Sequence, residues 1–278
     1  MEIDLPPVPP EGAAPAGPAA LLLIAVASAA SLWAVGGVVA RLRRGEPAVP
    51  QRAHPQVPWT GIDVATVVYL WICCQFLSSA LLPRPATIAD QLAGGAVGMA
   101  AATSLASAWL LYRRAPPSAL GFGLGSLAAD LRLATAALAL ILAPLLAVAG
   151  MLDRLVPYEH PIIDFLVRHR DLPSLMLVGI AAVIVAPVAE EFFFRRVLQG
   201  WLEKVWGAAP AIGASAVWFG LAHVGQGLAW VPLVAFGVVA GYLARQTGSI
   251  VPGIVLHALF NAVSLALVLW QTAPAAGR

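Results

Sequence analysis

Residues 173–196 read PSLMLVGIAAVIVAPVAEEFFFRR, a run too apolar for the surface of a soluble protein. Its apolar part ends at about residue 194. That is long enough to cross the hydrocarbon core of a bilayer as a helix, for which about 20 residues are needed. Two carboxylates, Glu190 and Glu191, stand inside this run. The stretch therefore predicts a membrane-spanning helix that carries charged groups.

The whole chain has the composition of a membrane protein. Of its 278 residues, 60% are hydrophobic and 11% are charged, whereas a soluble domain has about 25% charged residues. The 16 basic and 14 acidic residues nearly cancel. The chain thus lacks the basic excess of a nucleic-acid-binding protein, and no nucleic-acid partner is expected. A disordered acidic chain is excluded as well.

Eight apolar runs follow one another, which predicts an all-α, polytopic membrane protein with about eight transmembrane helices. The runs cover about residues 19–40, 62–82, 88–112, 131–151, 173–194, 208–228, 231–245 and 250–270. Residues 1–18, rich in Pro, Gly and Ala, are expected to form a disordered N-terminal tail. Residues 19–172 then form N-terminal membrane helices with an interfacial segment, and residues 173–270 a C-terminal membrane region.

Arginine and lysine residues cluster at alternate ends of the predicted helices. Those on one face are Arg41, Arg43, Arg44, Arg52, Arg113, Arg114, Arg195, Arg196, Lys204 and Arg245. The positive-inside rule assigns this face to the cytoplasm, with both termini outside. Four arginines fall on the opposite face, namely Arg84, Arg154, Arg168 and Arg170. The pattern predicts a multi-pass protein of the cell membrane.

The segment LVPYEHPIIDFLVRHRD, residues 155–171, connects two of the predicted spans. Ile162, Phe165 and Leu166 would share one face of a helix lying in the membrane interface. A plain connecting loop is the alternative.

Small residues and cysteines in the apolar runs have structural explanations. Gly94 and Gly98, like Gly237 and Gly241, are four residues apart, and this spacing lets helix backbones approach closely in lipid. The adjacent pair Cys73–Cys74 cannot form a disulfide without strain. We therefore expect two buried, inert thiols.

Several polar residues also have ordinary explanations. Three aspartates at the starts of spans are expected to cap helices, namely Asp63, Asp90 and Asp130. Three histidines in polar loops are expected at the surface, namely His54, His160 and His169.

Glu190, Glu191 and Arg195 have no such explanation. A charged group at the bilayer centre costs about 2.5 to 3.5 kcal/mol on the insertion scale. Arg195 follows Glu191 by four residues and can pair with it on one helix face, whereas Glu190 points about 100 degrees away. Pro187 removes a backbone hydrogen bond and can bend the helix, which makes room for water beside Glu190.

His223, His257 and Asn261 are the other polar groups within apolar runs. His257 and Asn261 are four residues apart and share a helix face. A rise of about 1.5 Å per residue puts Glu190, His223 and Asn261 roughly 20 to 22 Å from one membrane face, and His257 roughly 13 Å from it. Tilt can bring all four to one level, provided that the helix of Glu190 continues to about residue 204.

These residues resemble three motifs of the CAAX protease and bacteriocin-processing family of intramembrane endopeptidases, also called the CPBP or Abi family. EExxxR runs from Glu190 to Arg195, FxxxH from Phe219 to His223, and HxxxN from His257 to Asn261. The similarity covers about residues 173–267, so residues 173–270 are expected to be the catalytic membrane region. Arg196 stands where members usually carry Gly.

The resemblance implies that the chain hydrolyses a peptide bond in a membrane-associated peptide or lipidated protein, within membrane lipid. Peptide maturation and self-immunity are the roles linked to bacterial members. Hydrolysis needs an activated water, a stabilised oxyanion and a proton donor for the leaving amine. Glu190 would activate the water, which His223 would orient. His257 and Asn261 would stabilise the oxyanion, and the Glu191–Arg195 pair would position Glu190.

Three alternatives remain open from the sequence. Glu190, His223 and His257 are a possible zinc ligand set with Glu191 as the base, although no HExxH motif is present. Gly213, Ala214 and Ser215 weakly resemble the GxS of rhomboid serine proteases. A non-catalytic scaffold, an immunity protein or a transporter with a proton path would also hold buried Glu and His.

Overall fold

The structure is a computed structural model that describes residues 18–54, 56–158 and 161–272. These residues form helices joined by turns and loops, and no β-strand occurs among them. The all-α prediction is therefore confirmed for this part of the chain. The predicted tail lies outside the described residues apart from Pro18, which begins the first helix.

The helices follow the predicted apolar runs. They are α1 (Pro18–Arg43), α2 (Gly61–Ala80), α3 (Ile88–Tyr112), η1 (Pro117–Leu120), α4 (Leu127–Leu155), α5 (Pro161–Arg168), α6 (Leu172–Gly179), η2 (Ile180–Val185), α7 (Ala186–Glu190), η3 (Glu191–Leu198), α8 (Gln199–Trp206), α9 (Ala208–Leu221), α10 (Trp230–Thr247) and α11 (Val251–Gln271). The segments from α6 to α8 abut and form one helical run, in which η2 and η3 are π-helical. This run reaches Trp206. The helix of Glu190 therefore continues past residue 204, which is the condition for Glu190 to lie at the predicted depth.

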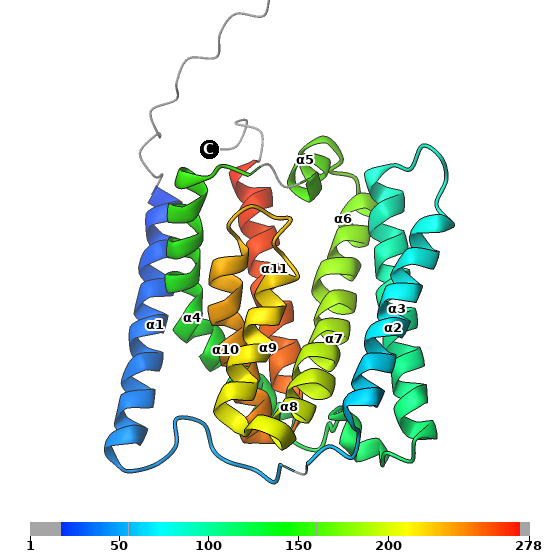
Figure 1. Cartoon of the computed structure of the whole chain (residues 1–278). Helices are drawn as coiled ribbons and strands as arrows, with labels where there is room; N and C mark the ends of the chain where they lie inside the picture. Colours follow the sequence, from blue (N-terminus) through cyan, green and yellow to red (C-terminus); the bar gives the residue numbers. More distant parts are fainter. Residues whose placement is uncertain (1–17, 55, 159–160, 273–278) are drawn as a thin grey trace, which may run out of the picture.

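Six helices within the described residues are long and apolar enough to cross a membrane. They are α1 from Ala25 on, α2, α3, α4, the run from α6 to α8, and α11. Of the other two predicted crossings, α9 has only 14 residues and α10 is not among the six. The count of about eight therefore stays a prediction. In Figure 1 successive long helices alternate in direction, and the turns after α1, α3, α8 and α10 gather at one end.

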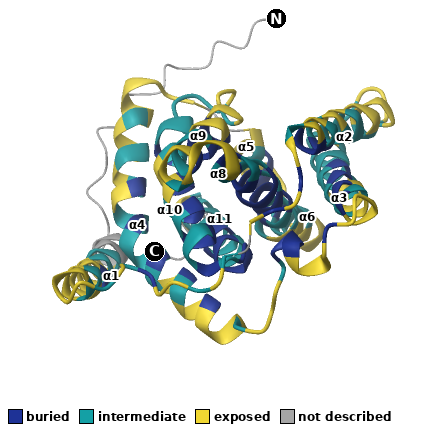
Figure 2. Ribbon diagram, turned by 60° about the horizontal axis from the view of Figure 1, so that its bottom comes forward, coloured by how far each residue is buried: buried dark blue, intermediate teal, exposed yellow. Residues whose placement is uncertain are grey.

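Buried residues concentrate in the C-terminal helices. Figure 2 shows dark blue, buried faces on α9, α10 and α11, while α1 and α2 lie on opposite flanks of the molecule and are largely exposed or half-buried. Large apolar side chains such as Leu32 and Phe76 point outward from these flanking helices. Outward-facing apolar side chains are expected of helices that meet lipid.

The glycines spaced by four residues sit at close helix contacts, as predicted. A Cβ on Gly237 of α10 would lie 2.9 Å from the Cα of Ala216 in α9. A Cβ on Gly98 of α3 would lie 2.7 Å from the Oγ of Ser78 in α2. Both distances are shorter than side-chain contacts normally allow, so only glycine permits these helices to pack so closely.

Two of the three predicted caps have the expected form. Asp63 accepts a hydrogen bond from the backbone N–H of Thr60 at 2.9 Å, and Asp90 accepts one from that of Thr87 at 2.9 Å. Each closes a capping box at the start of a helix. Asp171 caps α6 in a similar way, and the backbone N–H of Ser174 holds the pKa of its carboxyl below the usual range.

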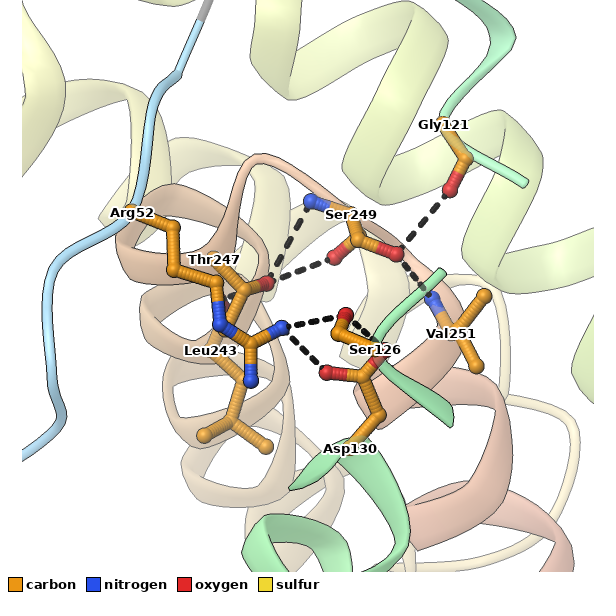
Figure 3. A network of polar contacts seen from close by, with 8 residues as sticks. All are labelled: Arg52, Gly121, Ser126, Asp130, Leu243, Thr247, Ser249 and Val251. Carbon is orange, nitrogen blue, oxygen red and sulfur yellow. Dashed lines mark hydrogen bonds and ion pairs between the residues drawn. The ribbon is translucent and has the colours of Figure 1, made fainter. Parts of the chain in front are cut away.

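Asp130 takes part in a wider polar network, drawn in Figure 3. Its carboxylate accepts a hydrogen bond from Ser126, the N-cap residue of α4, and is bound by the guanidinium of Arg52. Beside it, Ser249 donates to the backbone oxygen of Gly121 at 3.2 Å. The network joins the loop after α1 and the segment before α4 to the turn between α10 and α11.

The loop histidines differ from one another. His169 is exposed, as predicted, and His160 lies outside the described residues. His54 was expected at the surface, and this expectation is wrong. Its side chain is only 11% exposed and lies 2.8 Å from a carboxylate oxygen of Glu203 in α8. The buried carboxylate of Glu203 draws the loop onto the helix bundle.

Residues 161–168 form a short helix, so the interfacial segment is helical in its second half. Phe165 and Leu166 of α5 are buried against Val178 of α6, and Ile162 packs on the same cluster. The amphipathic pattern is confirmed as a helix rather than a plain loop. Cys73 and Cys74 are free thiols, as expected, but half-buried rather than buried.

Candidate active site

The helical run from α6 to α8 departs from α-helical geometry on both sides of Glu190. Pro187 lies at the start of α7, between the π-helical segments η2 and η3. The backbone N–H of Ala186 reaches back five residues to the oxygen of Ala181. Such π-turns are rare and occur frequently at functional sites. The sequence predicts only a lost hydrogen bond and a bend at Pro187, and the π-helical segments on either side of α7 are a finding of the structure.

Glu191 is held in a fully buried polar cluster. One of its carboxylate oxygens lies 3.1 Å from the Nε of Arg195, and neither side chain is exposed. The guanidinium of Arg195 also lies 4.6 Å from the ring centre of Phe219 and donates to the Oγ of Ser215 at 3.3 Å. Ser215 in turn donates to the backbone oxygen of Phe194 at 2.8 Å. These contacts offset part of the cost of burying the ion pair, and the Nη2 of Arg195 has no hydrogen-bond partner among the described residues.

His257 lies between the two glutamates. Its Nδ1 is 3.2 Å from Glu191 Oε1, and its Nε2 is 4.0 Å from Glu190 Oε2. Gly253, one helical turn earlier in α11, makes this approach possible, because a Cβ there would lie 2.9 Å from Glu191 Oε2. The small residue thus lets α11 pack directly on the carboxylate.

Glu190 faces both histidines. Its Oε2 lies 3.9 Å from the Nε2 of His223 and has no hydrogen-bond partner of its own among the described residues. The Nδ1 of His223 bonds to the backbone oxygen of Phe219 at 2.8 Å. The side chains are 18% exposed at His223, 12% at Glu190 and 0% at Glu191. Access to the cluster therefore decreases from His223 toward Glu191.

Asn261 lies on the same face of α11 as His257. Its amide Nδ2 donates to the backbone oxygen of Ala182 in η2 at 2.8 Å. This bond uses one of the two N–H groups of the amide. The structure therefore gathers Glu190, Glu191, Arg195, His223 and His257 through direct contacts, whereas Asn261 joins them through the backbone of η2.

This geometry lies in the part of the chain that has known relatives. Residues 172–263 match the family described as type II CAAX prenyl endopeptidase Rce1-like. The match begins with α6 and ends just after Asn261, so it covers about a third of the chain and contains all six candidate residues. It confirms the resemblance to CAAX-type endopeptidases stated from the three motifs. No curated protein and no solved structure matches the chain.

The Rce1-like region contains supporting residues that the sequence did not single out for this role. Ser215 was considered only as a nucleophile, and Gly253 was not considered. Both stand one helical turn before a motif residue, Ser215 before Phe219 and Gly253 before His257. A small residue at that spacing is their local signal in the sequence, but it does not distinguish them from the many other small residues of the membrane helices.

The zinc alternative can be tested on distances. Glu190, His223 and His257 are suitable zinc ligands in kind, and each histidine turns its Nε2 toward Glu190 while its Nδ1 is hydrogen-bonded. In a tetrahedral site with bonds of about 2.0 to 2.1 Å, neighbouring ligand atoms lie about 3.4 Å apart. Here the separations are 3.9 and 4.0 Å. Both separations are about 0.5 Å wider than those of a tetrahedral zinc site, and no group of three such side chains among the described residues is arranged to hold a metal.

Proposed function

We propose that this chain is an intramembrane endopeptidase of the CAAX type, which hydrolyses a peptide bond with water activated by Glu190. The observation that carries the proposal is the position of Glu190. Its carboxylate faces the Nε2 atoms of two histidines at a partly accessible point, within a region that matches CAAX prenyl endopeptidases.

The hydrogen-bond partners fix where the ring protons lie. A backbone oxygen only accepts, so the Nδ1 of His223, which bonds to Phe219 O, carries a proton. The Nδ1 of His257 likewise donates to the carboxylate of Glu191. In its neutral form His223 therefore presents a bare Nε2 toward Glu190, and that atom accepts a hydrogen bond.

A water molecule suits the space between Glu190 and His223. The separation of 3.9 Å exceeds the length of a direct hydrogen bond, and polar groups at such distances are commonly bridged by water. The water would donate one hydrogen to Glu190 Oε2 and the other to His223 Nε2. Its lone pair then remains free to attack a substrate carbonyl.

The proposed reaction conserves its protons. Glu190 takes one proton as the water oxygen bonds to the carbonyl carbon, which leaves a tetrahedral oxyanion. The protonated Glu190 then gives this proton to the leaving amine as the C–N bond breaks. The direct products are a new carboxylic acid and a new amine, and the acid then passes its proton to the amine, which gives a carboxylate and an ammonium group.

His257 and Asn261 are the proposed donors to the oxyanion. Because the Nδ1–H of His257 is used on Glu191, donation from its Nε2 requires the doubly protonated ring. Asn261 offers the N–H that it does not spend on Ala182 O. Glu191 and Arg195 act as positioning residues, since Glu191 is fully buried and holds His257 in place.

The proposed substrate is a peptide segment at the membrane, and a prenylated C-terminus is the one indicated by the name of the matched family. The chain would act as a multi-pass protein of the cell membrane with about eight crossings, of which α9 and α10 are the short ones. Zinc has no proposed role, because the spacing at Glu190 does not fit it.

Cleavage of two reporter peptides by the purified full-length protein in lipid nanodiscs tests the proposal. One peptide carries a farnesylated CaaX terminus, and the other has the same sequence without the lipid. We expect Glu190→Gln to lower kcat by at least about a thousandfold, since it removes the general base. We expect cleavage to persist after exhaustive chelation, with no metal found by elemental analysis.

Glu203→Gln is the matched control. Glu203 is also a largely buried glutamate in the α6–α8 run, and it contacts His54 rather than the candidate site. We expect its kcat to stay within a few-fold of the wild-type value. Cleavage by Glu190→Gln at the wild-type rate would overturn the role of Glu190. A folded wild-type protein that cleaves neither peptide, and traps no peptide from native membranes as Glu190→Gln, would favour the non-catalytic scaffold.

A further inference from the structure

A second feature lies apart from the candidate active site. A cleft of about 830 Å³ opens between the C-terminal half of α1, α4 and the walls of α9 and α10. None of the six candidate site residues lines it. Its size is within the range of about 300 to 1,000 Å³ that is usual for small-molecule sites.

The walls of the cleft are apolar along nearly their whole length. Trp33 and Gly37 line it from α1, Leu140 from α4, Gly213 from α9 and Val239 from α10. Apolar walls of this kind offer few hydrogen-bond partners to water. A hydrocarbon chain matches such walls, and the exposed flank of α1 places the cleft beside lipid.

The end of the cleft is basic. Arg41 and Arg44 line it at the C-terminus of α1, where the predicted span meets the headgroup level. Both contact Glu46, at 3.2 and 3.0 Å. At the mouth itself, Arg41 and Arg44 carry two positive charges against the one negative charge of Glu46, so an excess of one positive charge remains after this pairing. The cleft thus joins an apolar groove to a cationic mouth.

We propose that this cleft binds one anionic phospholipid, with an acyl chain between α1 and α10 and its phosphate at Arg41 and Arg44. Basic residues near a membrane surface attract anionic headgroups by about 1 kcal/mol each. The mouth lies at the end of the bundle where the other basic turns gather (Figure 1). The arginines therefore select the charge of the headgroup, and the apolar walls hold the chain.

Native mass spectrometry of the full-length protein tests the headgroup contact. The probes are dioleoyl phosphatidylglycerol and dioleoyl phosphatidylcholine, which share acyl chains and differ in charge. We expect the wild type to retain phosphatidylglycerol preferentially. The double variant Arg41→Gln/Arg44→Gln should lose about fivefold in affinity for each arginine removed. Arg43→Gln is the matched control, since Arg43 does not line the cleft, and it should retain the lipid.

Two neighbouring glycines test the acyl-chain contact. A Cβ at Gly36 or at Gly37 meets nothing within 4 Å, so both positions accept a side chain without a clash. Only Gly37 lines the cleft. We expect Gly37→Leu to displace the bound phospholipid and Gly36→Leu to retain it.

Three results would overturn the proposal. The first is equal retention of phosphatidylglycerol by the wild type, the double arginine variant and Gly37→Leu. The second is displacement of the phospholipid by a farnesylated peptide in a one-to-one ratio, which would make the cleft a substrate site. The third is a dimer that dissociates in Gly37→Leu, which would assign the cleft to a second copy of the chain. None of these results depends on Glu190, so the outcome is independent of the proposed protease activity.

Discussion

Glu190 and Glu191 are neighbours in the chain, but different groups surround their two carboxylates. Glu191 is fully buried and shared between Arg195 and His257. Glu190 has an oxygen without a direct partner and faces the more exposed His223. A carboxylate paired directly with an arginine is a poor proton acceptor, whereas a partly accessible one with an unpaired oxygen beside the neutral ring of His223 is a suitable base. The contrast supports Glu190, rather than Glu191, as the residue that activates water.

Gly253→Ala is expected to slow cleavage without abolishing folding. The added Cβ would lie 2.9 Å from Glu191 Oε2, so the carboxylate must shift and carry His257 with it. Small misplacements of this kind cost up to about a hundredfold in rate, and we expect kcat to fall about tenfold with KM little changed. Steady-state kinetics on the reporter peptide measure both constants.

The matched control is Gly179→Ala, because a Cβ at Gly179 of α6 meets nothing within 4 Å. It should leave kcat unchanged. If Gly253→Ala were as fast as the wild type, the contact of α11 with Glu191 would not position the site.

Ser215→Ala is expected to retain cleavage within about tenfold of the wild type. The hydroxyl donates to Phe194 O and accepts from Arg195, which makes it a support for the ion pair rather than a nucleophile. Its loss should lower the free energy of unfolding by about 1 to 3 kcal/mol. Thermal unfolding and reporter cleavage check the two effects, and a folded but inactive variant would instead favour a serine nucleophile.

The sequence identified the charged members of the site but not their supports. Glu190, Glu191 and Arg195 stand out because a charge in an apolar run has a large cost. Ser215 and Gly253 are small residues among many in the membrane helices, where such residues usually mean packing. Only the contacts of the folded chain separate these two from the rest.

At the scale of helices, the run from α6 to α8 shows what a local pattern can predict. The candidate site residues reach one depth in the membrane only if this helix continues beyond the three phenylalanines to about residue 204. The structure confirms that continuation, because the helical run ends at Trp206. The π-turns were not predicted, because their backbone hydrogen bonds have no sequence pattern of their own. Pro187 is the one local signal, and it does not specify a π-turn. They add residues to a turn and so change the directions of the side chains that follow.

Gly237→Leu is expected to destabilise the pairing of α9 with α10. A Cβ there would lie 2.9 Å from the Cα of Ala216, which is backbone and cannot move aside. Overpacking of this kind costs about 1 to 3 kcal/mol in the free energy of unfolding. Thermal unfolding in detergent measures the loss. Gly150→Leu in α4 serves as the control, since a Cβ there meets nothing within 4 Å, and equal melting temperatures for the two variants would contradict the close contact.

At the scale of the molecule, the alternating directions of the helices place the basic turns at one end (Figure 1). We predict that this end is cytoplasmic. In a background without Cys73 and Cys74, Pro83→Cys should react with an impermeant maleimide on intact cells, because it lies in the loop between α2 and α3. Ser118→Cys, in η1 at the basic end, should react only after permeabilisation. The reverse pattern would invert the topology.

Contacts between distant parts of the chain were the least predictable. His54 and Glu203 are far apart in sequence; His54 was expected at the surface of a polar loop, and Glu203 was assigned no role. In the folded chain they lie 2.8 Å apart and tie the loop after α1 to α8. Nothing in either local sequence specifies the other partner, so the all-α class and the apolar helices were more predictable than the loops that hold the bundle together.

The most direct test of water activation by Glu190 is cleavage of the farnesylated reporter in water enriched in ¹⁸O, in the presence of excess chelator. We predict one ¹⁸O atom in the new C-terminal carboxylate of the wild-type product, seen by mass spectrometry, and no product from Glu190→Gln. Product formed by Glu190→Gln at the wild-type rate, or a wild-type product without ¹⁸O, would contradict hydrolysis by a water that Glu190 activates.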